Sequence, residues 1–481
     1  MKRLLVLLVL LYAYHTLNAQ DFRSHFDAFT QQSVDEFNRF REACNQRYVE
    51  FLRQAWVECE AQKAIDRPKE EWLPPVIVKE DRAHPAVNRP ISIETVVFPP
   101  KDTIRPHPFS PVVERPVDQD ICCFDFFNTQ VSVRVAERCR FRLESVDERG
   151  IAAAWESLSG PAFDNALVDC LQFRDKHRLC DWAYLLLLHG FSHSFFDTDN
   201  EATLLTAYLF SQSGYQMRLG RSEGKLFLLV ATDYQIYNQP FYTLDGQRYW
   251  ALGQTSSSLR AVSHDFPGGR PLSLAIEESP LLECSASEER IRTSFDDVVS
   301  VSCQVNLNLL ALYDCYPDGQ WGNNPLTRWA LYANAPLDPY VRTSLYPALQ
   351  EVLSGKSLSE AADILLNFVQ TAFSYQSDDK EWGYDRSFFA EETLFYPYAD
   401  CEDRSILYAR LVRDLLGLDV VLVYYPGHLA TAVKFPKEIP GDYLELDSGR
   451  YLVCDPTYIG ASIGMTMPTV KGIPAQAILL K

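Results

Sequence analysis

Residues 400–455 restrict the fold more than any other stretch, because a helical pattern is followed at once by patterns typical of β-strands. Leucines recur at helical spacing at Leu407, Leu411 and Leu415, and Gly417 is placed to end the helix. Short runs rich in β-branched residues follow within a few positions. This order predicts a helix packed against an antiparallel sheet, and therefore an α+β fold.

The β-rich runs at residues 418–424 and 429–435 are separated by a sequence suited to a tight turn. Residues 425–428 read Tyr-Pro-Gly-His, with proline second and glycine third. Proline presets the backbone for the second position of such a turn, and glycine tolerates the third. The sequence therefore predicts a hairpin in which His428 opens the second strand.

Cys401 lies in the first turn of the predicted helix, beside Asp400 and Asp403. Short acidic side chains suit this place, because they accept hydrogen bonds from the free backbone N–H groups. The positive end of the helix dipole also favours a thiolate over a thiol. A sulfur nucleophile needs a base and a group that orients the base. The later strands supply His428 and, at the end of the third strand, Asp455.

The order of helix-start cysteine, strand histidine and strand aspartate resembles the transglutaminase-like superfamily, which has a papain-like core. The motifs that carry the resemblance are Asp-Cys-Glu-Asp-Arg-Ser at 400–405, Gly-His at 427–428 and Cys-Asp-Pro-Thr at 454–457. The resemblance implies that Cys401 attacks an amide or acyl carbonyl and that His428 is general base and then acid. It implies that Asp455 orients the imidazole. Any one of the three residues alone would more often be structural.

In that superfamily a residue upstream of the cysteine helps the cysteine backbone N–H to hold the oxyanion. Gln370, Tyr375 and Trp382 are the candidates here. The implied activity is that of a cysteine peptidase, amidase or acyltransferase acting on a peptide or protein. Hydrolysis is favoured over transfer, because water is always present and no amine pocket is evident. The alternative is a non-catalytic exported scaffold or binding protein. No cofactor and no metal is implied.

The N-terminal sequence is typical of a signal peptide, residues 1–19. Lys2 and Arg3 precede an apolar run, which ends in the small residue Ala19. The sequence thus predicts export to the periplasm, the cell surface or the medium. No later stretch is apolar enough to cross a bilayer. Loss of the two N-terminal cations takes the formal charge from −19 to −21, and an acidic surface argues against binding to nucleic acid.

The cysteines, twelve in number, form neither a CxxC motif nor a zinc-binding pattern. Several lie inside apolar runs, so we expect mainly buried thiols. Cys170 with Cys180, and Cys44 with Cys59, are candidate disulfides, because an exported chain can keep them oxidised.

Residues 20–66 predict a long amphipathic helix, continuous over residues 22–60. Apolar or small residues recur from Phe22 to Cys59 in steps of three and four that repeat every eleven residues. Such a repeat nearly matches a straight helix. The aromatic stripe must be buried, either against the same chain or through self-association.

Residues 67–120 hold 11 of the 28 prolines. Because proline lacks a backbone donor and fixes φ, this stretch should be extended. It is either a linker or a strap over a domain surface. The short apolar runs at 76–78 and 91–98 favour the strap.

Residues 121–300 carry a weaker copy of the C-terminal pattern. The matched pairs are Gly214 with Gly417, Gly224-Lys225 with Gly427-His428, and Arg248-Tyr249 with Arg450-Tyr451. In this copy Thr198, Lys225 and Gly253 stand in place of the cysteine, histidine and aspartate. The match predicts a degenerate transglutaminase-like domain before a catalytic domain at 301–481, with chance similarity as the alternative. Residues 300–317 are predicted to be a long strand.

Overall fold

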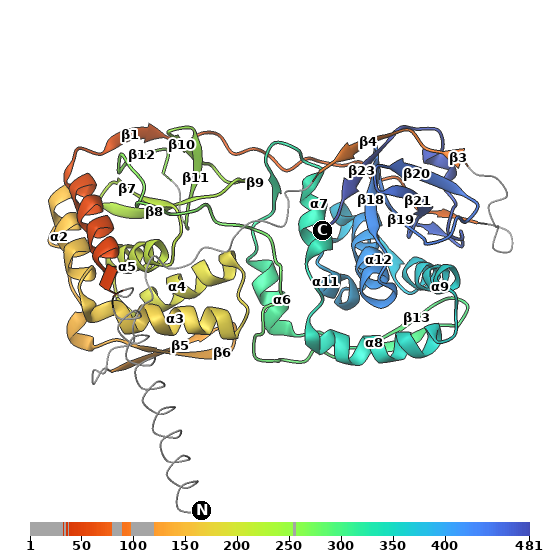
Figure 1. Ribbon diagram of the computed structural model, residues 1–481, viewed down its shortest axis with the longest axis horizontal. Coiled ribbons are helices and arrows are strands. Elements are labelled where there is room, and N and C mark those ends of the chain that lie inside the picture. The colour runs from red at the N-terminus through yellow and green to blue at the C-terminus, as the bar shows by residue number, and fades with distance from the viewer. Residues whose placement is uncertain (1–31, 33–34, 37, 79–88, 98–119, 254–255) are drawn as a thin grey trace, which may run out of the picture.

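The computed structural model describes residues 32, 35–36, 38–78, 89–97, 120–253 and 256–481, which form two lobes (Figure 1). Each lobe has a sheet with helices packed against it, so the fold mixes helix and sheet and is compatible with the predicted α+β class. The predicted signal peptide lies outside the described residues. None of the described helices is long and apolar enough to span a bilayer.

The C-terminal lobe is built on a seven-stranded sheet in the order β3-β20-β21-β19-β18-β23-β4. Its strands are β3 (Arg89–Pro90), β4 (Ile93–Val96), β18 (Val420–Tyr425), β19 (His428–Val433), β20 (Asp442–Leu446), β21 (Gly449–Cys454) and β23 (Ala475–Leu479). Neighbouring strands are antiparallel, except that the edge strands β3 and β4 run parallel to their partners. Helix α12 (Cys401–Leu416) packs against β19, and α9 (Leu358–Thr371) packs against α12.

The local sequence signals of this lobe act as predicted. Asp400 caps α12 through a capping box with Asp403, and Gly417 ends the helix with φ of 64°. Tyr425 pairs with His428 across the hairpin turn, and Gly427 has φ of 75°. The positive φ at both glycines explains why no larger residue stands there.

Further helices and short strands complete the C-terminal lobe. They are α6 (Leu307–Asp314), α7 (Thr327–Asn334), α8 (Pro339–Leu353), β16 (Ser374–Tyr375), α10 (Asp378–Glu381), α11 (Ala390–Phe395), β17 (Tyr398–Ala399) and β22 (Tyr458–Ile459). The prediction of a long strand over 300–317 is wrong. Only β14 (Ser300–Cys303) is a strand, paired with β13 (Arg290–Thr293), and α6 follows. Asn306 starts α6 by accepting a hydrogen bond from the Asn308 N–H.

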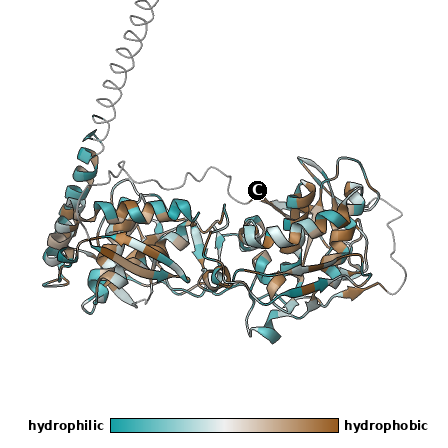
Figure 2. Ribbon diagram, turned by 90° about the horizontal axis from the view of Figure 1, so that it is seen from below, coloured by the Kyte–Doolittle hydropathy of each residue, from teal (hydrophilic) through white to brown (hydrophobic). Residues whose placement is uncertain are grey.

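The N-terminal lobe has a six-stranded sheet in the order β1-β12-β7-β8-β11-β10. Its strands are β1 (Val57–Glu60), β7 (Met217–Ser222), β8 (Lys225–Ala231), β10 (Tyr242–Leu244), β11 (Gln247–Ala251) and β12 (Ser258–Ala261). Its helices are α2 (Glu148–Leu158), α3 (Asp164–Lys176), α4 (Asp181–Phe195) and α5 (Asp199–Gln212). A separate hairpin of β5 (Ile121–Phe126) and β6 (Thr129–Arg134) precedes these helices in the chain. Strand β9 (Tyr234–Ile236) pairs with β15 (Gly319–Trp321). Apolar residues gather on the inner strands and helices of both lobes (Figure 2).

The two sheets share their strand order, since β1-β12-β7-β8-β11-β10 matches β4-β23-β18-β19-β21-β20 position for position. In both lobes a helix is followed by a hairpin and then a third strand. The register also agrees: Thr431, three residues after His428, pairs with Cys454, and Leu228, three residues after Lys225, accepts a hydrogen bond from the Leu252 N–H. The predicted helix, hairpin and strand order is therefore present in both lobes.

The prediction of a continuous helix over residues 22–60 is wrong at its C-terminal end. The helix ends at Arg53, and Val57–Glu60 forms β1, paired with β12. The backbone hydrogen bonds of the sheet edge outweigh the helical pattern here. Residues 22–31 lie outside the described part of the chain. Phe40 of the predicted stripe is 49% exposed. Tyr48 is buried against Trp155, so this portion packs on its own lobe.

The proline-rich stretch lies on the C-terminal lobe as a strap. Val76–Ile77 (β2) pairs with β22, and β3 and β4 cover the two edges of the seven-stranded sheet. The outermost strands are therefore short, and short edge strands offer little backbone for pairing with another chain. Residues 79–88 and 98–119 lie outside the described residues. The twelve cysteines, all within the described ranges, form no disulfide, so both candidate pairs are absent.

Candidate active site

The structure brings the three predicted site residues to one end of the C-terminal sheet. Cys401 is the first residue of α12, His428 opens β19, and Asp455 directly follows β21. The Nε2 atom of His428 lies 2.8 Å from Oδ2 of Asp455. All three side chains are buried, and those of Cys401 and His428 are 0% exposed. A buried carboxylate on one ring nitrogen fixes the orientation and the tautomer of a histidine.

The loop after Asp455 is held by its own carboxylate and by Gln370. Oδ1 of Asp455 accepts hydrogen bonds from the backbone N–H groups of Thr457 at 2.9 Å and Tyr458 at 3.2 Å. The Gln370 amide nitrogen donates to the carbonyls of Asp455 at 2.9 Å, Tyr458 at 2.8 Å and Ala461 at 3.1 Å. An amide NH₂ has only two hydrogens, so none is left for an oxyanion. In this arrangement Gln370 is a positioning residue, and of the three oxyanion candidates it has its amide hydrogens already engaged.

Of the remaining oxyanion candidates, Tyr375 interacts with Cys401, whereas Trp382 packs among aromatic rings. Burial, then the charges of Cys401 and Asp400, raise the pKa of the Tyr375 hydroxyl. The hydroxyl therefore stays protonated, and it donates to the Leu73 carbonyl at 3.3 Å. Trp382 instead packs in an aromatic cluster, with its ring 5.0 Å from that of Tyr396.

The predicted thiolate at the helix start is not favoured in this arrangement. Burial raises the pKa of Cys401 well above its usual value, and the carboxylates of Asp400 and Glu402 raise it further. The Leu429 N–H lowers it by less. No hydrogen bond joins the sulfur to the histidine ring, since Nδ1 of His428 is buried without a partner in the described chain. Desolvation outweighs the helix dipole, because the dipole contributes only about 0.3–1 kcal/mol.

Two neighbours of Cys401 fasten the start of α12 to the rest of the site. Ser405 Oγ donates to the Leu429 carbonyl at 2.9 Å, one residue beyond the histidine. Arg404 is fully buried and donates to the carbonyls of Gln370 at 3.1 Å and Phe373 at 2.7 Å. Neither residue had a predicted role. The signal was present in Asp-Cys-Glu-Asp-Arg-Ser, because an arginine within an apolar helix must find carbonyl or carboxylate partners.

A group of buried carboxylates lies beside the cysteine. Oxygens of Asp378, Asp385 and Glu402 lie within 4.8 Å of one another. One oxygen of Glu402 is buried without a hydrogen-bond partner. Burial raises the pKa of all three. Oxygen ligands of this kind can hold a hard cation such as Ca²⁺ or Mg²⁺. No metal-binding motif in the sequence indicates this group, because its three residues are brought together only by the fold.

Buried acids in this lobe predict a pH-dependent stability. Burial raises the pKa of Asp378 to about 7, of Glu391 to about 8 and of Glu392 to about 7. Each group binds a proton more tightly in the folded chain than in the unfolded chain. The stability that they contribute is therefore present in full below about pH 4 and is lost as the pH rises through about 7 to 8.

We expect the unfolding temperature to be about 5 °C or more lower at pH 8.5 than at pH 6, measured by circular dichroism. Glu391→Gln, which cannot ionise, should flatten this slope. An unfolding temperature that rises between pH 6 and pH 8.5 would contradict the prediction.

The N-terminal lobe has none of this chemistry at the matching positions. Thr198 directly precedes α5, within one residue of the place that Cys401 takes in α12, and its hydroxyl donates to the Glu201 carboxylate without capping the helix. Lys225 opens β8 on the surface, and Gly253 has φ of 82°, where a side chain would be strained.

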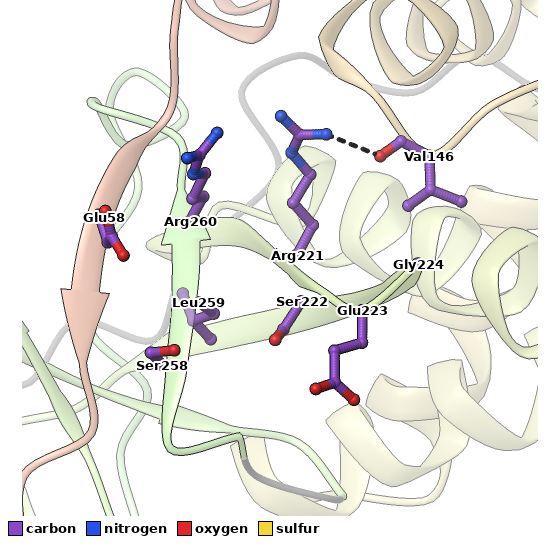
Figure 3. A pocket seen from close by; sticks show the side chains of 9 residues that line it. All are labelled: Glu58, Val146, Arg221, Ser222, Glu223, Gly224, Ser258, Leu259 and Arg260. Atoms are coloured by element: carbon purple, nitrogen blue, oxygen red, sulfur yellow. Dashed lines mark hydrogen bonds between the residues drawn. The ribbon is translucent and has the colours of Figure 1, made fainter.

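Beside the hairpin turn of β7 and β8 lies a polar cavity of about 280 Å³ (Figure 3). Arg221 and Arg260 extend into it from paired strands, and Arg221 donates to the Val146 carbonyl at 3.1 Å. Among the described residues, neither a cysteine nor a histidine lines it. The three candidate catalytic residues thus lie in the C-terminal lobe. No protein-family model, curated protein or solved structure matches this chain.

Proposed function

We propose that this chain is an exported cysteine hydrolase of the transglutaminase-like type, acting on amide bonds of peptides or proteins. The observation that carries the proposal is the buried pair of His428 and Asp455 beside the start of the cysteine helix. The aspartate occupies Nε2, so Nδ1 is the nitrogen available to a substrate-bound cysteine. A buried ring nitrogen without a partner is costly in a merely structural histidine.

In the proposed reaction Cys401 is the nucleophile and His428 the base. Nδ1 takes the thiol proton as the sulfur attacks the amide carbonyl carbon. The tetrahedral intermediate collapses, the C–N bond breaks, and His428 returns the proton to the leaving amine. A thioester remains on Cys401. Water then attacks it, with His428 again taking the proton, and the carboxylic acid and free thiol are released.

The negative charge on the carbonyl oxygen needs donors in both tetrahedral intermediates. The backbone N–H of Cys401 is one candidate, because the first N–H groups of a helix have no intrahelical acceptor. The Tyr375 hydroxyl is the second, since it stays protonated and already donates to a peptide carbonyl. Two such donors would match the arrangement that acyl-transfer enzymes use.

A non-catalytic scaffold is the second candidate function. The complete burial of Cys401 and the raised pKa of its thiol favour it, because a nucleophile must meet its substrate and lose its proton. The two candidates differ in one measurable respect, namely turnover.

We expect overnight incubation with a peptide library in H₂¹⁸O to give new C-termini that carry ¹⁸O, detected by mass spectrometry. Acyl transfer to an added primary amine would instead join the amine to the acyl part of the peptide. The product would then carry the mass of the amine in place of the released ammonia or leaving peptide. A scaffold gives neither product. Absence of both from wild-type chain and from the loosened variant described below would rule out the enzyme.

A further inference from the structure

Residues 69–78, here called the site strap, lie directly on the turn that precedes His428. The Leu73 N–H donates to the Gly427 carbonyl at 2.8 Å. The Glu71 carbonyl oxygen lies 2.7 Å from the point where a Cβ on Gly427 would stand. Only a glycine lets the two backbones approach this closely. The site strap therefore contacts the histidine side of the site through its main chain.

The site strap continues to the aspartate side of the site. Val76–Ile77 pairs in parallel with Tyr458–Ile459, and the Val78 N–H donates to the Ile459 carbonyl at 3.0 Å. Tyr458 is itself bound through its N–H to Asp455 at 3.2 Å. One extended segment thus spans the loops that carry both the histidine and the aspartate.

Two side chains of the site strap contact different surroundings, one aromatic and acidic and the other apolar. The Trp72 ring lies 5.9 Å from that of Trp329, and its Nε1 donates to Asp385 at 3.2 Å. Leu73 packs against the apolar outer face of the C-terminal sheet. The Leu73 carbonyl accepts a hydrogen bond from the Tyr375 hydroxyl, whose pKa is raised by burial and then by Cys401. A peptide carbonyl of the chain itself is thus bound by a proposed oxyanion donor.

We propose that the site strap occupies the substrate groove, and that the groove takes an extended apolar peptide with an aromatic residue followed by an aliphatic one. The inference rests on the proposed function and names its substrate class. Extended peptides commonly bind by main-chain pairing with exposed edges, while side-chain pockets give specificity. Cys401 is fully buried, so a neighbouring segment must move before a substrate reaches it, and the site strap is the segment that contacts both the histidine loop and the aspartate loop.

The sequence of the site strap makes its displacement feasible. Pro74 and Pro75 have no backbone N–H, so the segment forms fewer main-chain bonds than an ordinary peptide could. Its hold depends on being part of the same chain, which gives it a high effective concentration. A substrate without the two prolines can make the missing bonds and compete.

The first test measures alkylation of Cys401 by iodoacetamide, with each cysteine quantified by mass spectrometry. Trp72→Ala/Leu73→Ala should label Cys401 at least tenfold faster than the wild-type chain. Ile77→Ala is the matched control, because the Ile77 side chain is 64% exposed and its backbone pairing is kept. It should leave the rate unchanged.

Buried Cys170 and Cys454 report on folding in the same samples. Their labelling should stay slow in the double variant. If they react as fast as Cys401, the variant is unfolded, and Trp72→Ala alone replaces it with a smaller expected rise. Labelling of Cys401 at the wild-type rate in folded variants would overturn the proposal.

The second test adds the synthetic peptide of residues 69–78 to the double variant. It should restore slow labelling of Cys401, and the same peptide with alanine at both proline positions should do so at lower concentration. Neither peptide should affect the wild-type chain. Faster labelling that neither peptide reverses would show that the segment is a cover and not a substrate mimic.

The outcome of these tests can be distinguished from the outcome for the proposed hydrolase function. Labelling and protection need no turnover, so they report on the groove even in an inactive protein. If peptides protect Cys401 but no ¹⁸O enters any product, the peptide-binding groove is supported and the hydrolase activity is contradicted. If ¹⁸O enters products but the peptides do not protect Cys401, the hydrolase activity is supported and the proposed groove is contradicted.

Discussion

Replacing Cys401 with alanine is expected to reduce amide hydrolysis to background, a fall of about 10⁴-fold or more in kcat/KM. The proposed reaction has no other nucleophile, and His428 without the sulfur has nothing to deprotonate. Stability should change by only about 1 kcal/mol, because alanine is the best helix former and only one sulfur is lost. The ¹⁸O assay and thermal unfolding measure the two effects.

Cys170→Ala is the matched control for this experiment. Cys170 is also fully buried within a helix, α3, but it lies in the other lobe. Its replacement should cost a similar amount of stability and leave activity at the wild-type level. Hydrolysis by the Cys401→Ala chain at more than a hundredth of the wild-type rate would show that another group is the nucleophile.

The parts of the fold that sequence predicts are those set by local chemistry. The capping residue Asp400, the closing Gly417 and the Pro-Gly turn each act on their immediate neighbours, and each is found where the pattern indicates. The repeat is visible for the same reason, since Gly214 and Gly224 mark a helix end and a turn in the N-terminal lobe, as Gly417 and Gly427 do in the C-terminal lobe. Order along the chain then places His428 at the start of β19 and Asp455 directly after β21, the strand that pairs with β19.

The parts that sequence does not predict depend on contacts between distant segments. The proline pattern indicates an extended strap, but nothing local tells that Leu73 lies on Gly427. The role of Gln370 is hidden likewise, since its three acceptors lie 85 to 91 residues away. The run after residue 306 is ambiguous by composition, because short apolar segments suit a strand or a buried helix. The Asn306 side chain caps the first turn and so favours the helix over a strand.

The state of Cys401 is the clearest case of tertiary structure overriding a local rule. The helix start favours a thiolate, but full burial and two neighbouring carboxylates raise the pKa of the thiol. Displacement of the site strap would rehydrate the sulfur and lower that pKa. The same movement would admit substrate, so exposure and activation of the nucleophile would be coupled.

Replacing Asp455 with asparagine is expected to lower kcat by about 10²- to 10⁴-fold with little change in KM. The loop geometry gives the reason. Oδ1 of Asp455 accepts from the N–H groups of Thr457 and Tyr458, so an asparagine would keep its oxygen there. Its NH₂ group would then face Nε2 of His428 and donate to it. The ring proton would move to Nδ1, which could no longer accept the thiol proton.

Asp363→Asn is the matched control for this last variant. Asp363 accepts the Ile463 N–H at 3.0 Å, so it too holds the segment that follows β21. It should cost comparable stability and leave kcat within about threefold of wild type. If Asp455→Asn also stays within threefold, Asp455 does not set the tautomer. His428 would then act without an orienting carboxylate, and the assignment of three cooperating residues would be wrong.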